Sequence, residues 1–379
     1  MKKCMDFVKK ELVLCIAMLL AIVSSFIVMP DKEYIGYIDF RTLGILFCLM
    51  SVMAGLQNHG VFRFVAEGLL VKVKSIGQLL CILVMLCFVF SMFITNDVAL
   101  ITFVPFTFTL LQLLGEEQKK KLMIPIVILQ TIGANLGSML TPVGNPQNLY
   151  LYGKAGISLV AFLQLMLPYT TVSFVMLLAC CVFMGKSQKS GGLSVVFNEK
   201  TNLAGKGKYL VVYGALFVLS LLTVVRVVEV WLVFVIVCVV ILLMDKSVLK
   251  KVDYSLLLTF IGFFVFIGNM GRVEVFRSFL ETLVQGNEVA TAIISSQVIS
   301  NVPAALLLSG FTERYELLVI GVNLGGLGTL IASMASLISY KYLAKEDADA
   351  KGKYLLYFTV ANVCFLTVLV VVYNLMAVI

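Results

Sequence analysis

Residues 129–149 read LQTIGANLGSMLTPVGNPQNL, and this stretch decides the fold of the chain. It begins apolar enough for a lipid bilayer, but residues 141–148 then contain two prolines, a glycine and three carboxamide side chains. A helix cannot continue through such a segment. Because unpaired backbone groups are costly in hydrocarbon, the break must line a cavity that protein encloses. The stretch therefore predicts a transmembrane helix that is interrupted inside the membrane.

The same pattern occurs again at residues 321–337, GVNLGGLGTLIASMASL. Six positions are identical in register, Gly133, Asn135, Leu136, Gly137, Thr141 and Leu149 against Gly321, Asn323, Leu324, Gly325, Thr329 and Leu337. The two halves also share an acid–base pair one helical turn apart, Arg63 with Glu67 and Arg277 with Glu281. Broken helices at corresponding places in two halves mark the binding sites of transporters. We therefore expect a solute site at the two breaks.

The composition is that of a polytopic membrane protein. Of the 379 residues, 61% are hydrophobic and 13% are charged, whereas soluble domains average about 25% charged residues. The nine cysteines show no CxxC or histidine-paired spacing, so we expect reduced packing residues rather than disulfides or metal ligands. The basic N-terminus leads into an apolar run that we expect to remain as an uncleaved first span.

The sequence predicts an all-α protein with about nine full spans and two re-entrant helical hairpins. The first hairpin covers residues 75–114, whose apolar arms meet at residues 91–97 between basic flanks, and the second covers residues 286–311. Arm length alone does not exclude that each arm spans by itself. The broken helices are expected at about 124–152 and 316–341. The other spans are expected at about 12–30, 38–58, 158–184, 209–226, 230–245, 254–271 and 354–378.

The distribution of charge predicts that the two halves are inverted repeats. If the N-terminus is cytoplasmic, most of the 29 lysines and arginines fall on the cytoplasmic side, as the positive-inside rule requires. The first repeat, residues 12–185, then starts inside, and the second, residues 230–378, starts outside. The linking span at residues 209–226 inverts the second repeat. The C-terminus is accordingly expected on the outer side of the cell membrane.

Four motifs in chain order, TNDVALITFVP, GANLGSMLTPVGNPQNL, SNVPAALLLS and GVNLGGLGTL, resemble the ion transporter superfamily. This superfamily includes divalent anion/sodium symporters, citrate transporter-like permeases, arsenite permeases and one family of sodium/proton antiporters. The resemblance implies a scaffold at about 12–74 and 209–284 and a moving transport unit at about 75–184 and 286–378. It also implies elevator-like movement and a homodimer.

The resemblance further implies two sodium sites. In the sodium-coupled dicarboxylate members, each hairpin tip carries Ser-Asn-Thr with a hydroxyl residue four positions earlier, and the facing loop supplies carbonyl oxygens. This chain repeats the spacing in both halves, at Ser91, Thr95 and Asn96 and at Ser296, Ser300 and Asn301. Gly144 and Ala332 stand where the loop carbonyls would contribute, and such hard oxygen ligands suit a small cation. In the alternative interpretation the hydroxyls only donate to helix carbonyls.

Both tips depart from the dicarboxylate pattern. Asp97 follows the tip asparagine of the first half and Val302 follows that of the second, so neither tip has a substrate-facing threonine. An acid at this position resembles the arsenite permeases and the antiporters. Because an intramembrane carboxylate is costly, we expect Asp97 to be a cation ligand or proton carrier. The alternative is a cap, in which Asp97 accepts hydrogen bonds from the amides of Ala99 or Leu100.

Substrate contacts are expected from uncharged polar groups, because no lysine or arginine lies within either tip or break. The carboxamides that follow the first break are the main candidates, and the second-half counterparts are smaller, which predicts an asymmetric site. The complete set is Thr95, Asn96, Asp97, Thr141, Asn145, Gln147, Asn148, Ser300, Asn301, Thr329 and Ser333. His59, the only histidine, is expected at the membrane interface rather than in a proton relay.

These patterns predict a secondary active transporter rather than an enzyme. No Walker loop is present, so ATP does not drive transport within this chain. We expect a sodium or proton gradient to move a small anion or oxyanion, such as a carboxylate or an arsenite-like species. The alternative is a sodium/proton antiporter that uses Asp97. We expect no cofactor beyond the coupling ion and no nucleic-acid partner, since the net charge of +8 reflects membrane topology.

Overall fold

The computed structural model describes residues 11–186, 201–203 and 205–378. Within these residues the secondary structure is helical, without a β-strand. Seven of the helices are long and apolar enough to cross a membrane, and four shorter apolar helices accompany them. The protein is therefore an all-α polytopic membrane protein, as the sequence predicts.

The second half of the chain repeats the helix order of the first half. The first half contains α2 (Leu12–Ile27), α3 (Tyr34–Tyr37), α4 (Phe40–Asn58), α5 (Val61–Leu70), α6 (Ile76–Ile94), α7 (Asn96–Gln112), α8 (Glu116–Ser138), α9 (Pro146–Ala155) and α10 (Leu159–Lys186). After α11 (Gly207–Val224), the second half contains α12 (Val230–Met244), η1 (Lys246–Lys251), α13 (Tyr254–Gly271), α14 (Glu274–Val284), α15 (Glu288–Ile299), α16 (Asn301–Leu308), α17 (Tyr315–Gly325), η2 (Leu330–Ala332), α18 (Met334–Glu346) and α19 (Lys351–Val378).

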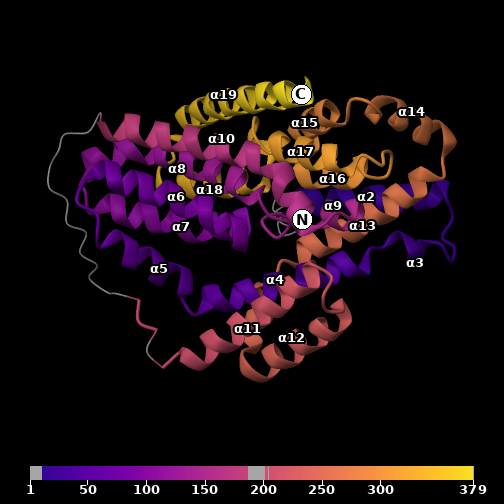
Figure 1. Cartoon of the computed structure of the whole chain (residues 1–379), viewed down its shortest axis with the longest axis horizontal. Coiled ribbons are helices and arrows are strands. Elements are labelled where there is room, and N and C mark those ends of the chain that lie inside the picture. Colours follow the sequence, from indigo (N-terminus) through magenta and orange to yellow (C-terminus); the bar gives the residue numbers. More distant parts are fainter. Residues whose placement is uncertain (1–10, 187–200, 204, 379) are drawn as a thin grey trace.

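Both predicted helix breaks are present. The first lies between α8 and α9, and α9 begins at Pro146, where a missing N–H does no harm. The second lies between α17 and α18 and contains only the short 3-10 turn η2. The two halves interlock at these breaks, because α17 packs on α9 and α18 packs on α7 and α8 (Figure 1).

Corresponding positions of the two halves have nearly the same backbone conformation. Asp39 is the N-cap of α4 and Asp253 is the N-cap of α13, and each carboxylate accepts a hydrogen bond of 2.9 Å from the amide three residues later. The residues before α9 and α18, Asn145 and Ser333, are both extended, with φ of −145° and −141°. The internal repeat seen in the sequence is therefore also a repeat of local structure.

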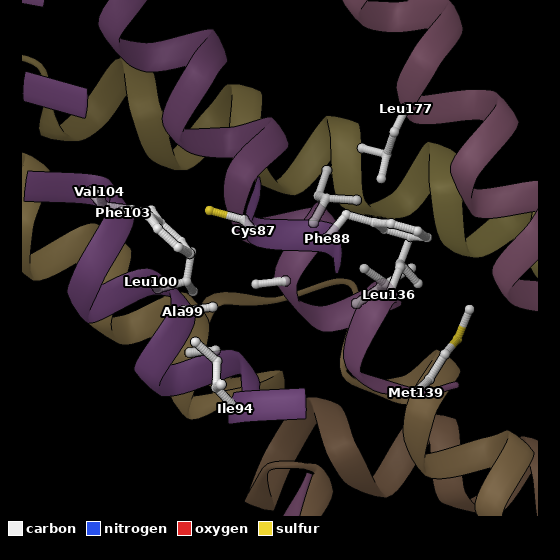
Figure 2. Close-up of a cluster of buried hydrophobic side chains, with 14 of the residues drawn as sticks. Cys87, Phe88, Ile94, Ala99, Leu100, Phe103, Val104, Leu136, Met139 and Leu177 are labelled. Atoms are coloured by element: carbon white, nitrogen blue, oxygen red, sulfur yellow. The ribbon is translucent and has the colours of Figure 1, made fainter. Parts of the chain in front are cut away.

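Apolar packing holds the first hairpin against its broken helix. Figure 2 shows buried side chains of α6, α7, α8 and α10 gathered beside the hairpin tip, among them Phe88, Ile94, Ala99, Leu136 and Leu177. A separate apolar cluster joins α4 to α11 and α12, which lie together at one edge of the molecule (Figure 1). The hairpin tip is thus positioned by a closely packed core.

Candidate functional site

Each hairpin tip contacts the break of its own half. The helices α6 and α7 meet at Thr95, and the next amide, Asn96 N–H, donates to Gly144 O at 3.3 Å. The helices α15 and α16 meet at Ser300, whose hydroxyl donates to Ala332 O, also at 3.3 Å. The structure therefore brings together the tip and loop residues that the sequence pairs in each half.

Asn135 connects the first tip to the second break. Its Oδ1 accepts hydrogen bonds from Asn96 Nδ2 and from Ser333 Oγ, both at 3.0 Å. Its Nδ2 donates to Ser336 Oγ at 3.4 Å and to Gly326 O at 3.5 Å. The side chain is buried, with 4% of its surface exposed. One carboxamide thus joins polar groups from both halves in the interior of the protein.

Asn323, the repeat counterpart of Asn135, makes the reciprocal connection. Its Nδ2 donates to Asn148 Oδ1 at 2.6 Å, and its Oδ1 accepts from Asn145 Nδ2 at 3.4 Å. Asn148 Nδ2 in turn donates to the carbonyls of residues 138, 139 and 141, which end α8. Because terminal helix carbonyls need partners, Asn148 has a structural role at the break. Its predicted contact with substrate stays a prediction.

Asn135 and Asn323 are site residues that the sequence did not assign, although both lie in the matched repeat register. Gln297 is a third. Its Nε2 donates to Gly325 O at 3.0 Å and to Leu327 O at 2.9 Å, and its Oε1 accepts from Thr329 N–H at 2.8 Å. Gln297 therefore satisfies free backbone groups of the second break, as Asn148 does at the first. No pattern in the sequence indicated this role.

The predicted hydroxyl groups are in place and donate within the protein. Ser91 Oγ donates to Phe88 O at 2.9 Å, and Ser296 Oγ donates to Ala292 O at 2.7 Å. Thr141 Oγ1 donates to the carbonyl of Met92 and so ties the first break to the hairpin. These bonds fit the back-bonding interpretation, but each hydroxyl oxygen keeps lone pairs that a cation can use.

The second tip asparagine has a different environment from the first. Asn301 is 5% exposed and lies against Gly326, where an added Cβ would come within 2.8 Å of Asn301 Nδ2. Thr329 Oγ1 donates to Gln297 O at 3.2 Å rather than reaching across to the first half. The site is therefore asymmetric, in line with the different side chains of the two breaks.

Buried polar atoms without a partner gather beside the first tip. Within the described part of the chain, Asp97 Oδ1, Asn145 Oδ1 and both polar atoms of Gln147 accept or donate no hydrogen bond. Among the described residues, the amides of Ala99 and Leu100 make no hydrogen bond to the Asp97 carboxylate, and Ala99 N–H donates to Thr95 O at 3.1 Å. The alternative in which Asp97 caps α7 stays a prediction. The three residues with unpaired atoms lie within three positions of the Asn96–Gly144 contact. Unpaired buried polar atoms each cost about 1–3 kcal/mol, and a bound solute would remove that cost.

His59 lies outside this network. Its ring stacks on Tyr209 at 4.4 Å, and its Nε2 is 3.5 Å from Asp245 Oδ2. Burial lowers the pKa of the imidazole. These contacts place His59 at the end of α4, against α11 and the C-terminal end of α12.

Residues 3–314 match the family model described as citrate transporter. The chain belongs to the citrate transporter family. The predicted membership of the ion transporter superfamily is thereby confirmed. The chain is 31% identical to the inner membrane protein YbiR of Escherichia coli over 325 residues, 84% of each chain. It is 31% identical to the uncharacterized transporter MJ0456 of Methanocaldococcus jannaschii over 346 residues, 90% of this chain and 92% of that protein.

A more distant relative of this citrate transporter family member is the silicon efflux transporter LSI3 of Oryza sativa subsp. japonica. The two are 32% identical over 142 residues, which is 38% of this chain and 28% of that protein.

The two tips of this citrate transporter family member are strained at the backbone. Thr95 has φ 70° and ψ 151°, and Ser300 has φ 73° and ψ 155°. Residues other than glycine rarely adopt this region of φ and ψ, and each instance costs about 1–3 kcal/mol. Strain of this kind persists where surrounding contacts fix a functional geometry. The same strained conformation at both tips therefore supports a functional role for the tips.

We expect Ser300→Gly to raise the free energy of unfolding by about 1 kcal/mol, because glycine relieves the strain at small entropic cost. Ion-coupled uptake should fall in the same variant, because glycine lacks the hydroxyl that contacts Ala332. Ser300→Ala is the control, since it removes the hydroxyl but keeps the strain. Thermal unfolding and uptake are measured side by side. Equal stability of the two variants would contradict stored strain.

Proposed function

We propose that this protein is a secondary active transporter in which a sodium or proton gradient moves a small anion or oxyanion. The observation that carries the proposal is the polar connection between the first tip, Asn135 and Ser333 of the second break. Buried polar side chains from two unwound breaks are affordable in a membrane protein when they line a solute site. Membership of the citrate transporter family supports a carrier rather than an enzyme.

The substrate is held without basic side chains in this proposal. Asn96, Asn145 and Gln147 offer amide groups, and the break between α8 and α9 offers freed backbone groups. Cations at the two tips would balance the charge of an anion. The relative named for silicon efflux supports including small inorganic oxyacids beside carboxylates among the candidate substrates.

The proposed transport cycle moves one part of the protein against another. In this proposal α4, α11 and α12, which share an apolar cluster of their own, belong to a scaffold, and the unit that moves carries both hairpins and breaks. The proposal includes inverted repeats, elevator-like movement, a homodimer through the scaffold, a cytoplasmic N-terminus and an external C-terminus. Cysteine accessibility on both sides of sealed vesicles tests the orientation.

Reconstitution in liposomes tests the transport proposal. Purified protein is supplied with labelled citrate, arsenite, sulfate or silicic acid, with an imposed sodium gradient or pH gradient. We expect accumulation of at least one solute that requires one of the gradients. Uptake that ignores both gradients would indicate a passive channel and would contradict the proposal.

A sodium/proton antiporter is the second candidate, and the unpartnered carboxylate oxygen of Asp97 favours it. We expect Asp97→Asn to remove the dependence of transport on pH, because asparagine keeps the size of the side chain but cannot carry a proton. The measurement is the collapse of an imposed pH gradient on addition of sodium, beside solute uptake. Asp349→Asn, an exposed acid between α18 and α19, is the control. Unchanged pH dependence in Asp97→Asn would remove this residue from proton coupling.

A further inference from the structure

A cavity of about 670 Å³ lies at the base of the second hairpin, away from the two tips. Arg277 and Glu281 of α14 and the following Gln285 form one wall, and residues 309–315, from the end of α16 to the start of α17, form another. Gly286 and Glu288, where the chain enters α15, complete the lining. The proposed transport site does not use any of these residues.

The two faces of α14 place this cavity at the membrane surface. Val275, Phe279 and Leu283 form an exposed apolar stripe, with 83%, 63% and 48% of their surfaces exposed. The cavity-lining residues of α14 follow two positions later, about 200° around the helix. An amphipathic helix of this kind lies in the headgroup region with its apolar face toward the acyl chains. The cavity on its other face is therefore at headgroup depth.

The cavity holds both signs of charge, and part of that charge is available to a ligand. Glu288 is 2% exposed, and its Oε1 accepts from Gly286 N–H at 3.3 Å and Thr312 Oγ1 at 3.2 Å. The Arg314 side chain is 67% exposed and only approaches Glu288, at 4.0 Å. Glu281 is 30% exposed, and its Oε1 accepts from Arg277 at 2.7 Å. A guanidinium and a carboxylate oxygen thus face the open space.

The first half of the chain contains an equivalent arginine–glutamate pair, and its carboxylate accepts further hydrogen bonds from the protein. Glu67, the counterpart of Glu281, accepts from Arg63 in the same way, at 2.8 Å. It also accepts from Thr201 N–H at 2.7 Å and from Thr201 Oγ1 at 3.0 Å, and it is 4% exposed. The chain itself therefore supplies two hydrogen-bond donors to this carboxylate. Among the described residues, none supplies such donors to Glu281.

We propose that the cavity binds the headgroup of a membrane phospholipid that carries a primary ammonium, such as phosphatidylethanolamine. The ammonium supplies the N–H donors that Glu281 lacks, and the phosphate pairs with the Arg314 guanidinium. The volume lies within the range of about 300–1,000 Å³ that small-molecule sites occupy. The acyl chains follow the exposed apolar face of α15, where Ile294 and Val298 are 67% and 71% exposed. A choline headgroup has the same charge but no N–H donor.

The test measures lipid binding to the purified full-length protein in detergent. Short-chain phosphatidylethanolamine and phosphatidylcholine with the same acyl chains are compared by affinity and by the shift of the unfolding temperature. We expect the ethanolamine lipid to bind at least about tenfold more tightly. Glu281→Gln and Arg314→Gln should each lose about tenfold in that affinity, since each removes one charge-assisted contact. Lys32→Gln, which removes an exposed charge outside the cavity, should not change it.

Soluble glycerophosphoethanolamine distinguishes a lipid from a free amine phosphate. We expect it to bind at the same residues but more weakly than the lipid, because it lacks the acyl chains. Equal binding of the soluble compound would overturn the assignment to a lipid. Equal binding of the ethanolamine and choline lipids, or an affinity that neither cavity variant changes, would overturn the site itself. These readouts do not depend on which solute the protein transports.

Discussion

Asn135→Ala is expected to reduce gradient-driven uptake by about a hundredfold, because about 3 kcal/mol of site organisation is lost. The substitution removes the acceptor shared by Asn96 Nδ2 and Ser333 Oγ, both at 3.0 Å. Each buried donor left without a partner costs about 1–3 kcal/mol. The first tip and the second break then lose their common anchor. Initial uptake rates in liposomes, normalised to folded protein, measure the effect.

The matched control is Asn362→Ala. Asn362 is as buried as Asn135, but its Nδ2 donates to Phe358 O within its own helix α19. Removing it should leave uptake near the wild-type rate, because that carbonyl is already part of a helix. If Asn135→Ala folds normally and transports as well as the control, the polar connection between the halves has no part in transport. The repeat counterpart Asn323→Ala should resemble Asn135→Ala, because it breaks the reciprocal connection.

The first break could be predicted because its cause is local, whereas the second was predicted because its residues repeat the register of the first. Pro142, Gly144 and Pro146 exclude a continuous helix wherever the rest of the chain lies. The hairpin tips followed from the repeat, since Thr95-Asn96 and Ser300-Asn301 fall at corresponding places. Arm length did not distinguish hairpins from full spans. The structure adds the contacts from each tip to its own break, which the sequence only implied.

The polar network between the halves could not be predicted, because its partners are distant in the chain. Asn135 and Ser336 are 201 positions apart, and no local pattern brings such residues together. Repeat matching also failed where the two halves use different side chains to bond the free backbone groups of the break. It pairs Asn148 with Ser336, whereas the structure completes the second break with Gln297 from the hairpin. The two repeats thus share their backbone conformation more closely than the side chains that bond the free backbone groups.

Gly137→Ala is expected to prevent the first hairpin from docking and to lower the free energy of unfolding by about 3 kcal/mol or more. A Cβ at this position would lie 1.9 Å from Phe88 O and 2.6 Å from Ser91 Oγ. The first of these atoms belongs to the backbone of α6, so a side-chain rotation cannot relieve the overlap. The helix α6 must instead move away from α8, and the hydrogen bond from Thr141 of the first break to Met92 O is then lost. Thermal unfolding and size-exclusion chromatography of the purified variant measure the loss.

Gly133→Ala separates this steric effect from a general intolerance of alanine in α8. Gly133 lies one helical turn earlier on the same face, and its nearest contact to an added Cβ is Val84 O at 3.4 Å. That variant should remain folded with a small loss of stability. In the second half, a Cβ at Gly325 would lie 2.7 Å from Ser296 Oγ, 2.9 Å from Ser296 Cβ and 3.0 Å from the backbone atom Ile293 Cα. These overlaps are smaller than the 1.9 Å approach at Gly137, so the effect of Gly325→Ala should be intermediate. If all three variants are equally stable, close approach of α6 and α8 does not fix the tip. A graded loss in the order Gly137, Gly325, Gly133 would instead show that small residues set the hairpin depth in both halves.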